Sequence, residues 1–383
     1  MNSPVYLDYN ATTPVDPRVL DAMLPYFTQK FGNAASKTHA FGWIAEQAVD
    51  TARKQVATLI NAEPSEIIFT SGATEAINLS LKGAYEAYRI KGNHIITVET
   101  EHKAVLDCCK KLEQQGAQVT YVPVNSDGLV SISQLQQAIT PQTIIICVML
   151  ANNEIGIIQP VEDIALIAHA HNIILMSDAT QAVGKIKVDV QQSHIDLMPL
   201  SAHKFYGPKG AGALFIRRKN PRVNLIAQMD GGGHERNLRS GTLNVPGIVG
   251  LGKACAIAAD EIAADIQRIT RLRDILQTTL QQLIPNTRVN GSLTARLPNT
   301  LNIAFPGIES IALLKHLANT VAAASGSACT SAVPEPSYVL KALGLDDTTA
   351  YSSIRFSLGK PTTADEIQFA IQQITAAVSK LEV

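Results

Sequence analysis

The chain has 383 residues, 46% of them hydrophobic, and its 32 basic residues nearly balance its 33 acidic residues. This composition excludes a disordered chain and predicts a folded protein of about two domains. Because there is no basic block, we do not expect nucleic acid as the main substrate. The longest apolar run, residues 144–151, is too short to span a membrane. Five scattered cysteines and a start without a signal or transit pattern favour the cytoplasm.

Short apolar runs alternate with amphipathic stretches of helix length from about residue 60 to residue 220. This alternation predicts an α/β fold with a mainly parallel sheet that helices cover on both faces. The predicted strands are Ile67–Thr70, Ile95–Val98, Val119–Val122, Ile144–Leu150, Ile173–Ser177, Leu197–Ser201 and Ala213–Ile216. Polar or small residues follow four of these runs, at 70–72, 152–154, 177–179 and 201–204. Ligands bind beyond the carboxyl ends of such strands, so these four clusters predict one site.

A different pattern begins after Asn244, with one long predicted helix over about residues 249–283. The pattern of the chain after this helix predicts a smaller α+β unit. Its strands are expected at 300–305, 321–324 and 354–358, and its helices at 310–318 and from 363 onward. We place the domain boundary inside the long helix. Residues 15–259 then form the large, cofactor-binding domain, and residues 1–14 and 260–383 form the small domain with a mobile loop at about 324–337.

Three features at the strand ends suit pyridoxal 5'-phosphate. Residues 71–75 join a predicted strand to a predicted helix, and the free N–H groups at the start of that helix can hold a phosphate. The same residues are also typical of an ordinary strand-to-helix turn that Thr74 caps. Asp178 follows an apolar strand and needs a partner, which a pyridinium nitrogen, a capped turn or a nearby cation would provide. Lys204 follows a strand at the same sheet edge and can form a Schiff base, with Lys209 as the second choice.

The cysteines divide into two groups. Cys329 lies in a run of small residues, 324–331, which predicts either an accessible nucleophilic thiol or a tolerated loop cysteine. The other four lie in helix or strand patterns and are predicted to be buried: Cys108, Cys109, Cys147 and Cys255. None of the cysteines has the CxxC spacing of a metal site, so we expect no bound metal.

Ten blocks of sequence, in order, carry a family resemblance. They include YLDYNATTP, FTSGATEAINLSLKG, SDATQAVGK, SAHKFYGPKGAGAL and SGSACTS. Together they resemble the pyridoxal-phosphate cysteine desulfurases of the NifS/IscS type, which have the class V aminotransferase fold, and the SGSACTS block resembles the long-loop group. The resemblance implies conversion of L-cysteine to L-alanine, with sulfur passing to Cys329 as a persulfide. An acceptor protein, such as an iron-sulfur cluster scaffold, would then receive that sulfur.

The same resemblance implies a role for each site residue. Lys204 would carry the internal aldimine, His102 would stack on the cofactor ring, and Asp178 and Gln181 would contact the ring nitrogen and the phenolic oxygen. The residues implied to hold the phosphate are Ala73, Thr74, Ser201 and His203, with Thr242 from the partner subunit of a homodimer. Asn153 would contact the cofactor and, with Arg355, the substrate carboxylate, which suits a guanidinium fork.

Two other classes of function remain open at this point. One is a selenocysteine lyase or a class V transaminase, for which Cys329 would be incidental. The other is a non-catalytic platform that binds partners through a retained fold. The joint presence of Lys204, Asp178, His102 and Cys329 disfavours the platform, because a degenerate site is expected to lose such groups.

Overall fold

The computed structural model describes residues 4–326 and 335–381. Its largest sheet has seven strands in the order β2-β8-β7-β6-β5-β3-β4. The strands are β2 (Ile67–Thr70), β3 (His94–Val98), β4 (Gln118–Val122), β5 (Thr143–Cys147), β6 (Ile174–Met176), β7 (Leu197–Ser201) and β8 (Gly212–Ile216). All neighbours are parallel except β8, which is antiparallel to both β2 and β7. The predicted α/β fold with a mainly parallel sheet is confirmed.

One predicted strand is longer than the observed one. The apolar run 144–150 predicts a strand to Leu150, but β5 ends at Cys147. Beyond that point the backbone no longer pairs with β3, and Met149 N donates to the Glu101 carboxylate, although Val148 N and Leu150 N still donate to the Met176 and Asp178 carbonyls at and beyond the end of β6. The apolar pattern reports burial, and burial continues after the strand has ended.

Helices cover both faces of this sheet. On one face α4 (Ala73–Tyr88) and α5 (Lys103–Glu113) pack on alternate strand residues such as Ile95 and Ile145. On the other face α3 (Ala40–Leu59) and α7 (Val161–Ala170) pack on the intervening residues, such as Ile96 and Ile146. Because successive strand residues point to opposite faces, one continuous apolar run supplies both layers. Four shorter helices complete this part among the described residues: α1 (Pro17–Met23), α2 (Pro25–Thr28), α6 (Ile132–Ala138) and α8 (His234–Asn237).

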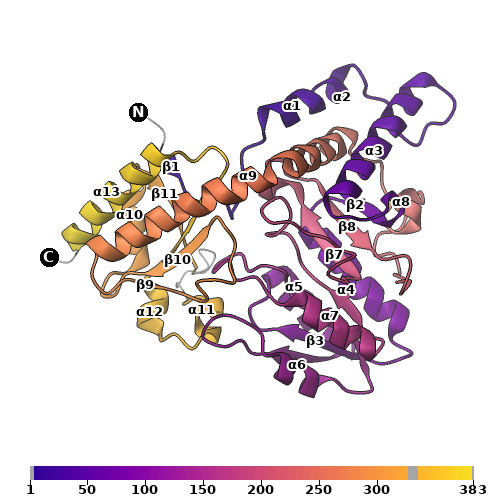
Figure 1. Ribbon diagram of the computed structural model, residues 1–383. Helices are drawn as coiled ribbons and strands as arrows, with labels where there is room; N and C mark the ends of the chain where they lie inside the picture. The colour runs from indigo at the N-terminus through magenta and orange to yellow at the C-terminus, as the bar shows by residue number, and fades with distance from the viewer. Residues whose placement is uncertain (1–3, 327–334, 382–383) are drawn as a thin grey trace.

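The long helix α9 (Val245–Leu283) crosses the molecule from one unit to the other (Figure 1). It begins four residues before the predicted start, because the Asn244 side chain caps it by accepting from Gly247 N. Its residues up to Ile257 belong to the hydrophobic core of the large unit, and those from Ile269 belong to a second core. This division of the core supports the proposed boundary after residue 259.

The smaller unit contains a four-stranded antiparallel sheet in the order β12-β13-β10-β9. Its strands are β9 (Arg288–Val289), β10 (Thr300–Ala304), β12 (Ala324–Ser325) and β13 (Ser353–Ser357), and its helices are α10 (Ser310–Leu317), α11 (Tyr338–Ala342), α12 (Asp347–Tyr351) and α13 (Ala364–Leu381). The predicted strand 321–324 divides in two, because β11 (Val321–Ala322) instead pairs in parallel with β1 (Val5–Tyr6). That pairing brings the N-terminal segment to the second unit, with Leu7 in its core.

None of the helices in the described residues is both long enough and apolar enough to cross a membrane.

Candidate active site

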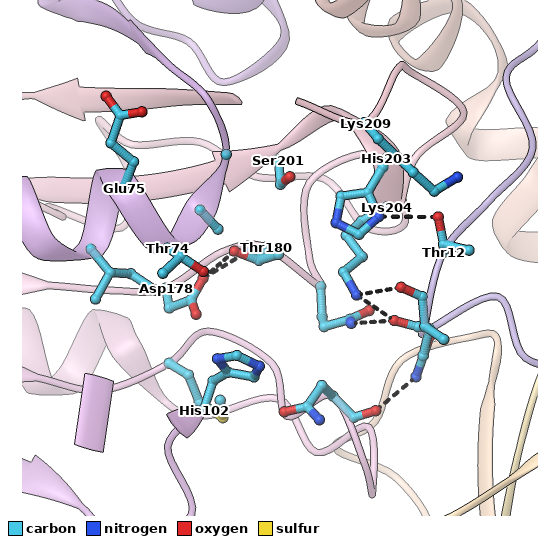
Figure 2. A pocket seen from close by; sticks show the side chains of 18 of the residues that line it. Thr12, Thr74, Glu75, His102, Asp178, Thr180, Ser201, His203, Lys204 and Lys209 are labelled. Atoms are coloured by element: carbon cyan, nitrogen blue, oxygen red, sulfur yellow. Dashed lines mark hydrogen bonds between the residues drawn. The ribbon is translucent and has the colours of Figure 1, made fainter. Parts of the chain in front are cut away.

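A cavity of about 710 Å³ opens at the carboxyl ends of the central strands (Figure 2). Its lining includes ten of the residues singled out from the sequence: Ala73, Thr74, His102, Asn153, Asp178, Gln181, Ser201, His203, Lys204 and Arg355. Two further residues singled out from the sequence are not among these ten. Thr242 is exposed and is absent from the wall of its own chain's cavity, and Cys329 lies outside the described residues. The four strand-end clusters therefore do meet at one site.

The N-terminus of α4 forms one end of the cavity. The helix begins at Ala73, and its N-cap is Gly72, which supplies no side-chain hydrogen bond. The alternative reading of a turn capped by Thr74 is therefore wrong, because Thr74 lies inside the first helical turn. The turn also sits tightly against β8, since a Cβ on Gly212 would lie 2.6 Å from the Gly72 Cα. Helix N-terminal N–H groups without a side-chain cap bind anions, and here they lie beside Ser201 and His203.

Asp178 lies on the cavity wall just after β6 and is 5% exposed. Its Oδ1 accepts hydrogen bonds from the Thr180 backbone N, at 2.9 Å, and from the Thr180 hydroxyl. The Asp178 carboxylate therefore caps the turn that follows it, as one of the predicted alternatives stated. This cap does not exclude the other reading, since a carboxylate has a second oxygen that can accept from a ligand.

Lys204 follows β7 in a single 3₁₀ turn, Ala202–Lys204. Its Nζ donates to the carbonyls of Asn10, at 2.7 Å, and Ala11, at 2.8 Å. Burial lowers the pKa of this amine to about 8; Arg355 lowers it further, while Asp8 and Asp178 oppose the shift. Lys209 is exposed and lines the same cavity (Figure 2). Of the two lysines, Lys204 is the more buried, and its Nζ bonds to residues 10 and 11.

Two histidines face the cavity from different elements. His102 caps α5, because its Nδ1 accepts from Ala104 N at 3.1 Å, and its ring stays exposed to the cavity. Desolvation by the surrounding walls lowers the pKa of His102, Lys204 lowers it further, and Asp178 opposes this. The pKa of His203 falls to about 4 because of burial and nearby lysines, and its Nδ1 lies 3.1 Å from the Thr12 hydroxyl. His203 is therefore neutral at pH 7.

Arg355, on β13, reaches the cavity from the smaller unit. Its Nη2 donates to Asp8 Oδ1 at 2.6 Å and its Nη1 donates to the Asn153 carbonyl at 2.9 Å. Among the described residues, its Nε and the Asn153 Oδ1 are buried polar atoms without a hydrogen-bond partner. Such atoms cost free energy unless something pairs with them, so this corner is suited to a polar ligand.

Several residues of the site were not singled out from the sequence. They are Asp8, Asn10, Thr12, Thr180 and Lys185, which bond to the residues named above. All five lie in the blocks YLDYNATTP and SDATQAVGK, and Lys185 is the final residue of the second block. The two blocks that carry the family resemblance therefore contained these residues. Nothing local in the sequence, however, shows that residues 8–12 lie at the ends of β6 and β7 in the folded chain.

Outside the cavity the cysteine prediction is confirmed for the described cysteines, which are all buried and unpaired: Cys108, Cys109, Cys147 and Cys255. Burial raises the pKa of each thiol, for Cys108 to about 11. In the part of the chain that the structure describes, no group of three or more His, Cys, Asp or Glu side chains is arranged to hold a metal ion.

Comparison with known proteins places this fold and site in a family. The profile of the family described as Aminotransferase class-V matches residues 5–369, and the chain belongs to that family. A relative named "Cysteine desulfurase IscS" from Anaeromyxobacter dehalogenans is 53% identical over 381 residues, covering 100% of this chain and 94% of the relative. A solved structure titled "NIFS-LIKE PROTEIN" superimposes with a TM-score of 0.92 at 39% identity, over 98% of this chain and 100% of the other. Another, titled "SspA in complex with cysteine", has a TM-score of 0.81 at 36% identity, over 92% and 98% of the two chains.

Proposed function

We propose that this protein is a cysteine desulfurase, an enzyme that converts L-cysteine to L-alanine. The observation that carries the proposal is the cavity in which an amine of lowered pKa, Lys204, shares its walls with Asp178 and the N-terminus of α4, in a chain whose relatives bear that name. In the reaction the C–S bond of cysteine breaks and an S–S bond forms to Cys329. The products are alanine and a Cys329 persulfide, so sulfur, protons and electrons balance without an added oxidant or reductant.

The proposed cofactor is pyridoxal 5'-phosphate, and the residues present fit it. The N-terminus of α4, free of a side-chain cap, suits the phosphate together with Ser201 and His203, and the buried Asp178 suits a protonated ring nitrogen. Lys204 suits the aldehyde carbon, because an amine of pKa about 8 is neutral for about a tenth of the time at pH 7, far more than an ordinary lysine. When bound, the cofactor supplies an electron sink for the bonds around the substrate Cα.

The remaining residues act on the substrate. The guanidinium of Arg355 binds the carboxylate of cysteine, and Asn153 offers its free Oδ1 to the amino group or the ring. His102, whose lowered pKa keeps the ring neutral near pH 7, exchanges a proton with the substrate while Lys204 moves the Cα proton. The thiolate of Cys329 then takes the sulfur, since a thiol is the one common side chain with an accessible, strongly nucleophilic anion near neutral pH.

We also propose a homodimer in which Thr242 completes the phosphate site of the partner subunit. Thr242 is exposed and does not line its own chain's cavity. Large apolar side chains are exposed over α1, α2 and the start of α3: Leu20, Leu24, Phe27, Phe31, Phe41, Trp43 and Ile44. Exposed apolar side chains gathered in one region mark an interface, and this region lies at one end of the large unit (Figure 1).

Light scattering tests the dimer. Phe27→Asp places a charge in this region and should shift the mass of the particle from two chains toward one. Leu166→Asp is the matched control, because Leu166 is 60% exposed but lies on α7, away from the proposed interface. A wild-type protein that is an active monomer at assay concentration would contradict the shared site.

The proposal also names a sulfur acceptor and a compartment. The acceptor is a protein such as an iron-sulfur cluster scaffold, which would collect sulfur from Cys329. A cytoplasmic location is proposed because the described cysteines are free thiols, as expected in a reducing compartment.

The decisive experiment is to incubate the loaded enzyme with L-cysteine and to measure alanine and protein-bound persulfide together. Peptide mass mapping without reductant should find one extra sulfur on Cys329. Cys329→Ser should stop alanine release while cofactor binding persists, and Cys108→Ala should leave both unchanged. Alanine release at the wild-type rate from Cys329→Ser would favour a lyase, and a keto acid product would favour a transaminase.

A further inference from the structure

Lys185 has no part in the chemistry proposed above, yet its amine lies directly behind the site. The residue is only partly exposed, and its Nζ donates to Asn10 Oδ1 at 2.9 Å and also to Gln181 Oε1. Gln181 in turn donates from Nε2 to the Asn10 carbonyl at 2.9 Å, the same carbonyl that accepts from Lys204 Nζ at 2.7 Å. Three side chains therefore converge on Asn10.

These partners determine which way the Gln181 amide faces. A backbone carbonyl can only accept, so the NH2 end of the amide must lie toward Asn10. The oxygen end must then lie toward Lys185, whose amine has N–H groups to donate. Gln181 lines the cavity and is 4% exposed, and one of its two N–H bonds is used by Asn10. The second N–H is left for a ligand in the cavity.

This arrangement does not depend on the charge of Lys185. Burial, Lys204 and Arg355 hold its pKa well below the ordinary lysine range. A neutral amine still has two N–H groups, which is the number required for Asn10 Oδ1 and Gln181 Oε1. Without Lys185, Asn10 Oδ1 would keep its second donor, Asn299 Nδ2 at 3.0 Å. Gln181 Oε1 would lose its donor in a buried place, so the amide could rotate.

We propose that Lys185 is a positioning residue that orients the Gln181 amide, so that the cavity presents an N–H donor to an anionic oxygen of the bound cofactor. The inference rests on the proposed function, because it takes pyridoxal phosphate as the ligand. Lys185 acts through Gln181 and does not touch the reacting atoms.

The test measures cofactor affinity, not turnover. Apoprotein is titrated with pyridoxal phosphate, and the dissociation constant and the visible absorption band are recorded. Lys185→Met should weaken binding about tenfold, as expected for losing a well-placed hydrogen bond to a charged oxygen, and should shift the band. Lys185→Arg, which keeps N–H donors, should restore affinity to within about threefold of wild type. Lys187→Met is the matched control, because Lys187 lies two residues away and is exposed, and it should bind like wild type.

A double-mutant cycle with Gln181→Leu separates positioning from a general structural effect. Once the amide has been removed, Lys185→Met should weaken cofactor binding by less than about twofold further. Additive losses, or a Lys185→Met variant with wild-type affinity and spectrum, would overturn the inference. If Lys185→Met does not give a cooperative thermal transition, Lys185→Gln replaces it, because its shorter side chain ends before the two acceptors. Failure of the wild-type protein to bind pyridoxal phosphate would instead contradict the proposed function.

Discussion

The two walls of the cavity are built in different ways. One wall is built where strands of the large sheet end and the following turns or helices begin. It carries Asp178, Ser201, Lys204 and the start of α4. The other consists of residues 8–12 and β13, which come from opposite ends of the chain. Asp8 and Arg355, 347 residues apart, form an ion pair there, and the Ser357 hydroxyl accepts from Asn10 N. The first wall depends on where each strand ends, whereas the second exists only after the chain has folded back on itself.

The largest effect is expected from a substitution in the first wall. Lys204→Ala should abolish covalent attachment of the cofactor and lower turnover by at least about a thousandfold, because the other lysine in the described lining of the cavity, Lys209, is exposed. Lys209→Ala is the control and should keep both. Borohydride reduction followed by peptide mapping should find the cofactor on Lys204, and a label on Lys209 would mean that the lysine is wrongly assigned.

The next largest effect is expected from a substitution in the second wall. Arg355→Lys keeps the charge but loses the fork that grips a carboxylate, so KM for L-cysteine should rise about tenfold or more while kcat falls less. Steady-state kinetics measures the split between the two constants. Asp8→Asn serves as the comparison, because it removes the ion pair but leaves the guanidinium. If both variants raise KM equally, the ion pair and not the fork is what matters.

A smaller effect concerns Glu154, which follows Asn153 of the cavity wall in the sequence and is 5% exposed. Burial raises its pKa from 4.5 to about 7, although Ser337 and Arg355 oppose the shift. The folded state therefore holds a proton that the unfolded state has lost, and the carboxyl costs stability increasingly as pH rises from about 4.5 to 7. Glu154→Gln should be more stable than wild type, with an advantage that grows by about 2 kcal/mol between pH 5 and pH 8.

Chemical denaturation at each pH measures this difference. Glu162→Gln is the control, since Glu162 is exposed and its substitution removes a carboxylate that is not buried. A flat difference for Glu154→Gln would show that the carboxyl is ionised at its ordinary pKa in the folded protein.

The smallest effect concerns a single contact between the walls. Thr12→Val removes the hydroxyl that lies 3.1 Å from His203 Nδ1 and should lower the free energy of unfolding by about 1 kcal/mol. The same change should leave borohydride labelling of Lys204 intact, because the backbone carbonyls of Asn10 and Ala11 that bond Lys204 remain. Loss of the label would show that the second wall is less independent of the first than their separate origins suggest.

The sequence by itself determined the α/β fold, the strand ends and the clustering of Asp178, Ser201 and Lys204 at one edge. It could do so because a buried parallel strand is an apolar run, and the polar residues that follow such runs must meet where the strands end. Two local predictions from the sequence were wrong. The run 144–150 predicted a strand longer than the observed β5, and the start of α4 has no side-chain cap, although a cap by Thr74 had been one alternative. The resemblance in ten blocks added Arg355 and His102, whose roles remain proposals.

Only the tertiary structure brought Asn10 and Thr12 to the cavity, paired Asp8 with Arg355 and showed that Lys185 reaches Asn10. Local periodicity carries no information about contacts between residues hundreds of positions apart. The shifted pKa values of Lys204 and Glu154 also depend on desolvation, and desolvation follows from how completely the folded chain buries the two groups. The chemistry of this site therefore arises from residues that the sequence lists far apart, because folding buries them together.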